Sequence, residues 1–165
     1  QVIDYYVRIA PVMLPHLAGR ACTMVRFPDG VTNKSFFAKN LPTHAPEWFD
    51  RVERNDVSYG IVNELAALVW AGNMAGIELH VPMHRDGDGP SGNPQRSPLP
   101  DRIVFDLDPG PNTDIRQCSQ VAQLINELIT PLGFAMAAKT SGSKGLQLYA
   151  TPPSPVARFQ PLMAL

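Results

Sequence analysis

The sequence predicts an α+β domain in which a mixed β-sheet is flanked by helices. Short apolar segments bounded by Pro and Gly are typical of strands, and one long segment has apolar residues at helical spacing. The chain has 165 residues, of which 44% are hydrophobic and 18% are charged. This length predicts a single domain. The composition excludes an intrinsically disordered chain, and the absence of long apolar runs excludes a membrane span.

The first half of the chain contains two predicted helices and three predicted strands. In order they are a helix over 3–17 that bends or breaks at Pro11 and Pro15, strands over 20–27 and 35–39, a helix over 62–73 and a strand over 77–81. The turn signal Pro28-Asp29-Gly30 lies between the first two strands and predicts a hairpin.

The second half begins with a long surface loop over 82–100, which is rich in Pro, Gly and Ser. We then expect a strand over 102–108, a helix over 113–130, and strands over 134–139 and 146–150 around a Gly-Ser loop. Thr113 is the predicted N-cap of the helix. Ile115, Cys118, Val121, Ile125, Leu128 and Ile129 give the helix its apolar face.

The net charge and the positions of the two cysteines exclude some classes of protein. The net charge of −1 excludes a strongly basic nucleic-acid binder, so any such binding must come from a local patch. Cys22 and Cys118 lie far apart and match no zinc or redox spacing, which favours a reducing compartment. Gln1 stands at the start and no leader is visible, so we expect a processed or excised chain.

The segment Arg102-Ile-Val-Phe-Asp-Leu-Asp-Pro-Gly110 carries a pair of carboxylates. Side chains alternate across a strand, so Asp106 and Asp108 face one side while Leu107 faces the core. Two carboxylates on one face repel each other unless a cation lies between them, and a hard divalent ion satisfies that need. The pair predicts a metal site at a strand end. The alternative is that both acids are simply solvated.

The segment Lys139-Thr-Ser-Gly-Ser-Lys-Gly-Leu-Gln-Leu-Tyr149 offers groups that suit a triphosphate. Ser141 and Ser143 supply hydroxyls, Lys139 and Lys144 supply charge, and glycines such as Gly145 let a ligand approach the backbone closely. Successive backbone amides can also form an anion-binding nest. The Walker spacing is absent, and an ordinary hairpin turn is the alternative.

Two further segments carry weaker signals. Phe36 and Phe37 are adjacent on a strand, so one can pack inward while the other, near Lys39, can stack on a base. A pair of Phe residues in the core is the alternative. His80 shares a strand face with Glu78 and could contact a phosphate or a metal, or it could be purely structural.

Taken together and in this order, these features resemble the polymerase domain of bacterial ligase D and the related archaeo-eukaryotic primase-type polymerases of non-homologous end joining. The matching segments are Asp4-Tyr-Tyr6, Arg26-Phe-Pro-Asp-Gly30, Phe36-Phe-Ala-Lys39, His44-Ala-Pro-Glu-Trp48, Glu78-Leu-His-Val-Pro82, Val104-Phe-Asp-Leu-Asp-Pro-Gly110 and Thr140-Ser-Gly-Ser-Lys-Gly-Leu146. The resemblance implies a primase-polymerase-like fold whose mixed sheet holds the nucleotide.

The resemblance also implies the chemistry, which is addition of ribonucleotides or deoxyribonucleotides to DNA ends during double-strand-break repair. Asp106 and Asp108 would be catalytic and hold two ions, Mn²⁺ or Mg²⁺, for phosphoryl transfer from nucleoside triphosphates. The implied nucleotide-binding residues are Phe36, Phe37, Lys39, His80, Ser141, Ser143, Lys144, Gly145 and Gln147. The implied partners are DNA ends with a 5′-phosphate, a ligase domain and Ku, with no membrane. The implied location is the bacterial cytoplasm at the nucleoid.

Departures from the family pattern weaken the expected activity. Gln147 stands where the family usually has a histidine, so the cationic grip on the triphosphate should be weaker. The family also has an N-terminal segment that binds the 5′-phosphate and a third metal-binding aspartate far downstream. Neither is expected within residues 1–165, so we expect a truncated domain that extends a primer poorly by itself.

Two other functions remain open from the sequence. Ile-Val-Phe-Asp-Leu-Asp also resembles the nucleophile strand of haloacid-dehalogenase-type phosphatases, in which Asp106 would attack phosphorus and Asp108 would be the general acid. Pro109-Gly110 after the pair departs from that pattern. The other alternative is a relative that binds nucleotides or nucleic acid without turnover, which Gln147 would favour.

Overall fold

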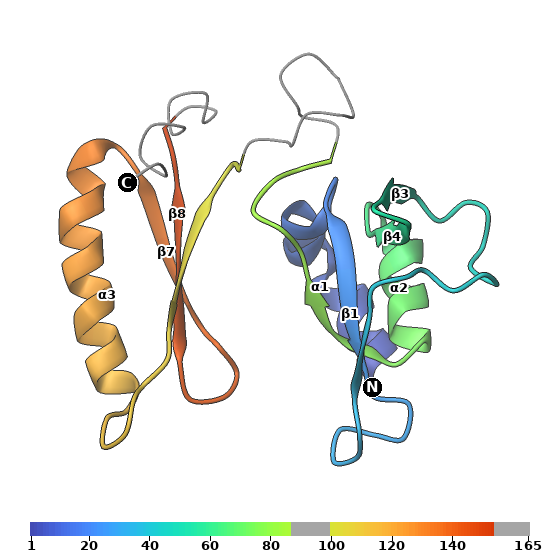
Figure 1. Ribbon diagram of the computed structural model, residues 1–165, viewed down its shortest axis with the longest axis horizontal. Helices are drawn as coiled ribbons and strands as arrows, with labels where there is room; N and C mark the ends of the chain where they lie inside the picture. Colours follow the sequence, from blue (N-terminus) through green and yellow to red (C-terminus); the bar gives the residue numbers. More distant parts are fainter. Residues whose placement is uncertain (87–99, 154–165) are drawn as a thin grey trace. The chain divides into compact units, whose positions relative to one another are not determined.

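The computed structural model describes residues 1–86 and 100–153 (Figure 1). The chain divides into two compact units, residues 1–98 and 99–165. Both units combine helices with β-strands, which confirms the α+β class. Most of the loop expected over 82–100 lies outside the described residues. No helix in the described ranges is long and apolar enough to cross a membrane.

The first unit is built around a central antiparallel strand. Its elements are α1 (Val2–Leu17), β1 (Ala21–Arg26), β2 (Phe36–Ala38), β3 (Arg51–Arg54), β4 (Val57–Ile61), α2 (Leu65–Asn73) and β5 (Gly76–His80). Strand β1 pairs antiparallel with β2, β4 and β5, so the predicted hairpin of β1 and β2 is confirmed. All pairings described in this unit are antiparallel, including that of β3 with β4.

We expected the helix over 3–17 to bend or break at its two prolines, and α1 is continuous from Val2 to Leu17, so it does not break. Pro11 and Pro15 both lie on the exposed side of the helix. A backbone carbonyl that loses its N–H partner there can bind water instead, so the helix continues.

The core of the first unit joins both helices to the sheet. Tyr6, Ala10 and Leu17 of α1 pack with Cys22 and Met24 of β1 and with Leu68 and Ala71 of α2. The two helices meet at Gly72, where an added Cβ would lie 2.9 Å from the Tyr6 ring. The Tyr6 hydroxyl donates a hydrogen bond of 2.8 Å to the carbonyl of Gly76, which ties α1 to the start of β5.

The hairpin of β3 and β4 was missing from the sequence prediction. Its turn is Asn55-Asp56, with φ of 47° and 62°, and both residues tolerate this left-handed conformation well. The strands are short and carry charged or polar residues on alternate positions, so their apolar pattern is weak.

The second unit is a three-stranded sheet covered on one face by a helix. Its elements are β6 (Ile103–Leu107), α3 (Ile115–Ile129), the 3-10 helix η1 (Thr130–Leu132), β7 (Ala135–Thr140) and β8 (Leu146–Thr151). The strand order is β6-β8-β7, and both pairings are antiparallel. The described strands thus form two antiparallel sheets, and not the one mixed sheet that we expected. Figure 1 shows α3 running along the sheet. Cys118 and Ala122 of the helix pack against Leu146 and Leu148 of β8.

The N-cap of α3 is Asp114 and not Thr113 as we expected. The Asp114 carboxylate accepts a hydrogen bond from the backbone N–H of Arg116, and the Gln117 side chain accepts one from the backbone N–H of Asp114. This reciprocal pair forms a capping box. The Thr113 hydroxyl instead donates to the carbonyl of Gly110 in the preceding turn.

Candidate functional site

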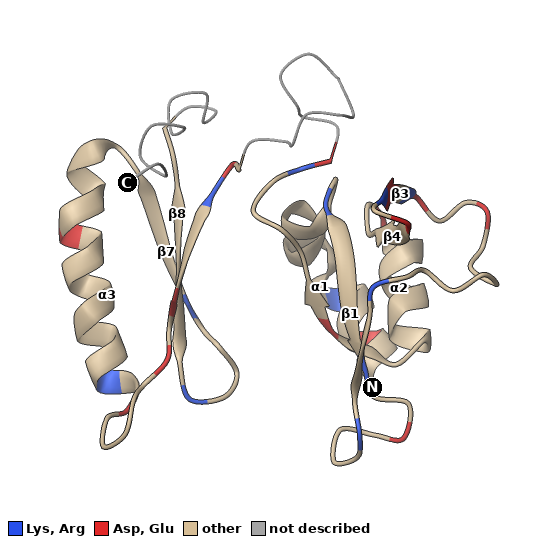
Figure 2. Ribbon diagram, in the orientation of Figure 1, with Lys and Arg blue, Asp and Glu red and all other residues tan. Residues whose placement is uncertain are grey.

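Asp106 and Asp108 lie on the face of the second sheet that α3 does not cover. Leu107 packs into the core formed with α3, and strand alternation therefore sends its two neighbours to the opposite face. Both aspartates are exposed, as the sequence predicted. Figure 2 shows this acidic end of β6 and the basic residues of the β7–β8 hairpin, so the sheet carries both signs of charge.

Gly145 allows the Asp108 carboxylate to lie against the β7–β8 loop. A Cβ at Gly145 would lie 2.5 Å from Asp108 Oδ1 and 2.7 Å from the carbonyl oxygen of Leu107. Real side chains do not tolerate such distances, so any larger residue would displace the loop from the carboxylate. Asp108 and the serine-lysine loop are therefore adjacent.

Ser141 organises that loop. Its hydroxyl oxygen accepts hydrogen bonds from the backbone N–H groups of Gly145 (3.0 Å) and Ser143 (3.3 Å). The Ser141 N–H in turn donates to the carbonyl of Gly145. The amides of Ser143 and Gly145 therefore point inside the loop and do not serve the anion-binding nest that we expected. The hydroxyl hydrogen of Ser141 is the group that the side chain can still donate to a ligand.

A row of polar side chains crosses the open face of the sheet. Gln147 of β8 lies opposite Asp106 of β6 on one side and opposite Lys139 of β7 on the other. Residues opposite each other in register point to the same face. The Asp106 and Lys139 side chains therefore flank Gln147, which places a carboxylate and an ammonium group on either side of an amide.

Tyr149 belongs to this face, and sequence reasoning did not assign it a role. Its hydroxyl donates a hydrogen bond of 3.1 Å to Gln147 Oε1, which leaves the Gln147 amide nitrogen to donate elsewhere. The Lys139 ammonium lies 5.8 Å from the centre of the Tyr149 ring, within the range of a cation–π contact. The signal that could have found Tyr149 is its position two residues after Gln147, because that spacing shares a face.

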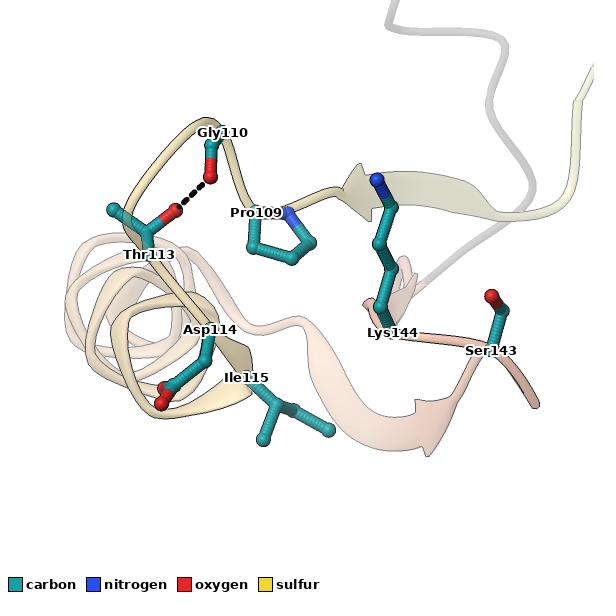
Figure 3. A pocket seen from close by; sticks show the side chains of 7 residues that line it. All are labelled: Pro109, Gly110, Thr113, Asp114, Ile115, Ser143 and Lys144. Atoms are coloured by element: carbon teal, nitrogen blue, oxygen red, sulfur yellow. Dashed lines mark hydrogen bonds between the residues drawn. The ribbon is translucent and has the colours of Figure 1, made fainter.

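A hollow of about 380 Å³ adjoins the same loop (Figure 3). Its lining residues are Pro109, Gly110, Thr113, Asp114, Ile115, Ser143 and Lys144. Lys144 supplies positive charge to it, and Asp114 supplies negative charge. The bidentate contact with the Arg116 guanidinium lowers the pKa of Asp114 below its usual value. The hollow therefore extends the site from the carboxylate pair toward the start of α3.

Phe36, Phe37 and His80 lie in the first unit. Phe37 is 67% exposed and Phe36 is 47% exposed, so neither packs inward as we expected of one of them. The Arg26 guanidinium lies 5.3 Å from the centre of the Phe36 ring and occupies that face. Phe37 contacts the His80 ring edge-on, with 5.9 Å between ring centres. Lys39 directly follows β2 and is exposed.

The residues present fit a hard divalent cation without forming a closed cage. Within residues 1–86 and 100–153, no three or more His, Cys, Asp or Glu side chains gather in a group that could hold a metal ion. Asp106 and Asp108 supply carboxylate oxygens, which are the ligands that Mg²⁺ and Mn²⁺ prefer. An exposed pair on a strand end leaves room for water or phosphate oxygens as further ligands.

The comparisons with known proteins place this α+β scaffold in the class of primase-type nucleotidyltransferases. The chain belongs to the family of the LigD primase-polymerase domain, whose family model matches residues 1–160. The resemblance seen in the sequence is therefore confirmed, and the comparisons give no support to the phosphatase alternative.

Relatives and a solved structure agree with this assignment. The chain is 40% identical over 160 residues to the multifunctional non-homologous end joining protein LigD of Mycolicibacterium smegmatis, covering 94% of this chain and 20% of that protein. It is 33% identical over 147 residues to the bifunctional LigD of Bacillus subtilis, covering 89% of this chain and 23% of that protein. The chain thus spans about a fifth of the length of these relatives.

The polymerase domain from Mycobacterium tuberculosis ligase D, solved in complex with DNA, matches with a TM-score of 0.84 and 37% sequence identity. The match covers 93% of this chain and 55% of that chain. The primase-polymerase-like fold that the sequence predicted is therefore confirmed.

Proposed function

We propose that this chain contributes to the addition of nucleotides from nucleoside triphosphates to DNA ends in double-strand-break repair, and that it extends a primer poorly by itself. The observation that carries the proposal is the contact between Asp108 and the loop at Gly145, because it joins metal-binding and phosphate-binding groups. The end-joining role of the relatives and the DNA bound to the tuberculosis polymerase domain support the DNA substrate.

In this proposal Asp106 and Asp108 hold two divalent ions, Mn²⁺ or Mg²⁺. When bound, such ions would reduce the effective charge of the triphosphate and make the primer hydroxyl a better nucleophile. Lys144 and the hydroxyls of Ser141 and Ser143 bind the phosphates. Gly145 keeps those groups close to the carboxylates, and Gln147 donates its amide hydrogens. The nucleotide is thereby oriented by the protein, which supplies most of what phosphoryl transfer requires.

The first unit carries the other residues that the resemblance assigns to nucleotide binding. Phe37 presents an exposed ring on which a base can stack, and Phe36 presents a second ring beside the Arg26 guanidinium. Lys39 adds positive charge for a phosphate, and His80 lies against Phe37. We propose that these four residues contact the incoming nucleotide or the DNA end.

We propose the partners and the location of the reaction from the resemblance to end-joining proteins. They are DNA ends with a 5′-phosphate, a ligase domain, Ku, and the bacterial cytoplasm at the nucleoid. The 55% coverage of the tuberculosis polymerase chain supports the further proposal that these residues are one part of a longer polymerase domain. A third aspartate and a 5′-phosphate-binding segment would belong to the rest of that domain.

The test is Mn²⁺-dependent binding of a ribonucleoside triphosphate, measured by calorimetry, for the chain and for Asp106→Asn/Asp108→Asn. Binding should require both the metal and the two carboxylates. Glu127→Gln is the matched control, because Glu127 is an exposed acid on α3 of the same unit. Binding that survives the double substitution would overturn the proposal. Binding without any primer extension by the longer domain would favour the non-catalytic alternative.

A further inference from the structure

Helix α3 has an apolar side that does not face the sheet. Cys118 and Ala122 are buried against β8, whereas a second row of large apolar side chains on α3 and η1 stays exposed. We call this second row the apolar flank. Its members and their exposed fractions are Val121 (44%), Leu124 (59%), Leu128 (73%) and Leu132 (68%). Their spacing of three and four residues places them on successive turns, so they form one continuous strip.

Helical geometry separates the apolar flank from the side of α3 that packs on the sheet. Each residue turns a helix by about 100°, so the α3 members of the flank lie roughly 100° around the axis from Cys118 and Ala122. The opposite flank of the helix carries exposed polar residues, which are Ser119, Gln123 and Asn126. A helix with water on both flanks is typically polar on both. The asymmetry therefore indicates that another element packs on the apolar flank.

The second unit also has a small core for its size. Its buried cluster within the described residues consists of Cys118, Ala122, Leu146 and Leu148. Two of these four side chains are small, so they bury little apolar surface. Between Ile115 and Ile129 the helix carries two charged residues, Arg116 and Glu127, which is few for a helix in water. Covering the apolar flank would give this unit the apolar burial that its core lacks.

The path of the chain indicates what covers the apolar flank. Thr151 at the end of β8 lies opposite Ala135 at the start of β7, just after η1. A Cβ at Gly133 would lie 3.2 Å from Pro153 Cγ, and Gly133 directly follows Leu132 of the flank. The chain therefore leaves β8 beside one end of the apolar flank. Elements that follow each other in sequence are usually adjacent in space, so the polypeptide beyond β8 is well placed to run along α3.

We propose that the apolar flank is the docking surface for the part of the longer polymerase domain that follows residue 165. This inference rests on the proposed function only in taking these residues as one part of that domain. The match to the tuberculosis polymerase domain covers 55% of that chain, so the rest of it has no counterpart here. A segment in the same polypeptide also meets the flank at a high effective concentration, which a second copy of the chain does not.

The test is the reaction rate of a cysteine placed on the apolar flank with a small thiol reagent. Leu128→Cys is suitable because Leu128 is 73% exposed and cysteine is itself a small apolar residue. Cys22 and Cys118 are buried, so the new thiol should react first. Labelling of Leu128→Cys should be about tenfold or more slower in the longer polymerase domain than in this chain, because a covered side chain reacts only when the contact opens. Equal rates in the two proteins would overturn the proposal.

Gln123→Cys is the matched control, because Gln123 is exposed on the opposite flank of the same helix. Its labelling rate should be the same in this chain and in the longer domain. Equal protection at Gln123→Cys and Leu128→Cys would mean that the whole helix is enclosed, and it would overturn the assignment of the surface to the apolar flank.

A dilution series separates the proposed occupant from a second copy of the chain. In this chain the labelling rate of Leu128→Cys should not depend on protein concentration. Protection that appears as the concentration rises would show that the apolar flank joins two copies, and it would overturn the proposal.

The labelling experiment needs no nucleotide, so its outcome is independent of the proposed function. A longer domain that protects Leu128→Cys but binds no nucleotide would contradict the proposed function and leave this inference standing. A longer domain that binds nucleotide while Leu128→Cys reacts freely would contradict this inference alone.

Discussion

Gly145 and Asp108 approach so closely that a single methyl group added to the glycine would lie 2.5 Å from the carboxylate oxygen Oδ1. The glycine is buried while the aspartate is exposed. This position therefore sets the distance between the proposed metal ligands and the phosphate-binding loop.

Gly145→Ala should abolish most of the metal-dependent nucleotide binding. The new Cβ also meets the Leu107 carbonyl oxygen, which is backbone and cannot move aside easily. We expect a loss of stability of about 1–3 kcal/mol, as for other overpacked sites. Calorimetry with Mn²⁺ and a ribonucleoside triphosphate, combined with urea unfolding, measures both effects.

Gly110→Ala is the control for that substitution. Gly110 lies two residues after Asp108, and an added Cβ there would meet only Thr113 Oγ1, at 4.0 Å. Although Gly110 lines the hollow, the added methyl group does not displace the loop, so Gly110→Ala should bind nucleotide more tightly than Gly145→Ala does. Equal losses in the two variants would contradict the role assigned to Gly145.

Gln147→His should introduce a pH dependence into triphosphate binding. Histidine has an ordinary pKa of about 6.5, so it gains positive charge as the pH falls from 8 to 6. Affinity for a polyanion should therefore rise on acidification in this variant relative to the unmodified chain. Affinity measured across this pH range in both proteins, with Gln147→Asn as the uncharged control, gives the comparison. Parallel pH profiles would argue against a phosphate contact at this position.

Phe37→Ala and Phe49→Ala should separate binding from stability. Phe37 is 67% exposed, so its removal should change the free energy of unfolding by less than about 0.5 kcal/mol. It should weaken binding of single-stranded DNA or nucleotide by about 1–3 kcal/mol, the range for a lost stacking platform. Phe49 is 2% exposed, and its removal should destabilise the fold by about 3–5 kcal/mol. Denaturation and fluorescence titration distinguish the two outcomes, and normal DNA binding by Phe37→Ala would remove Phe37 from the site.

Alkaline conditions should destabilise the first unit through Tyr6 and Cys22. Burial raises the pKa of Tyr6 from 10.0 to about 12 and that of the Cys22 thiol from 9.0 to about 12. The folded chain thus keeps protons that the unfolded chain releases. The contribution of these two groups to the free energy of unfolding is therefore fully present below pH 9 and is lost as the pH rises toward 12. Urea unfolding at intervals from pH 8 to 11 measures this slope. Cys22→Ala should flatten its first part, between pH 9 and 10, and an unchanged slope would exclude the thiol as a cause.

The carboxylate pair and the main elements could be predicted from the sequence because they depend on local rules. Strand alternation alone places Asp106 and Asp108 on the face opposite Leu107. The amphipathic spacing of α3 likewise shows which side of the helix packs on the sheet. The N-cap is Asp114, one residue after the predicted Thr113. The ionised Asp114 carboxylate accepts a hydrogen bond from the N–H of Arg116, at the start of the helix. The Thr113 hydroxyl instead donates to the carbonyl of Gly110.

The details of the site depend on tertiary contacts, which composition and spacing do not contain. The inward-pointing amides around Ser141 follow from the exact path of the loop. The exposure of Phe36 follows from the Arg26 side chain, which lies opposite it in the β1–β2 pairing. The bond from Tyr149 to Gln147 required knowing that both side chains remain on an uncovered face.

The hydrogen bonds that Ser141 accepts within its own loop also affect the entropy cost of binding a ligand. The Ser141 oxygen accepts hydrogen bonds from two backbone amides, so it cross-links the loop between β7 and β8 when the chain folds. The conformational entropy of ordering these residues is then lost during folding and not during association. Recognition of a phosphate by this loop therefore begins from a preorganised state, in which few rotatable bonds remain to be fixed.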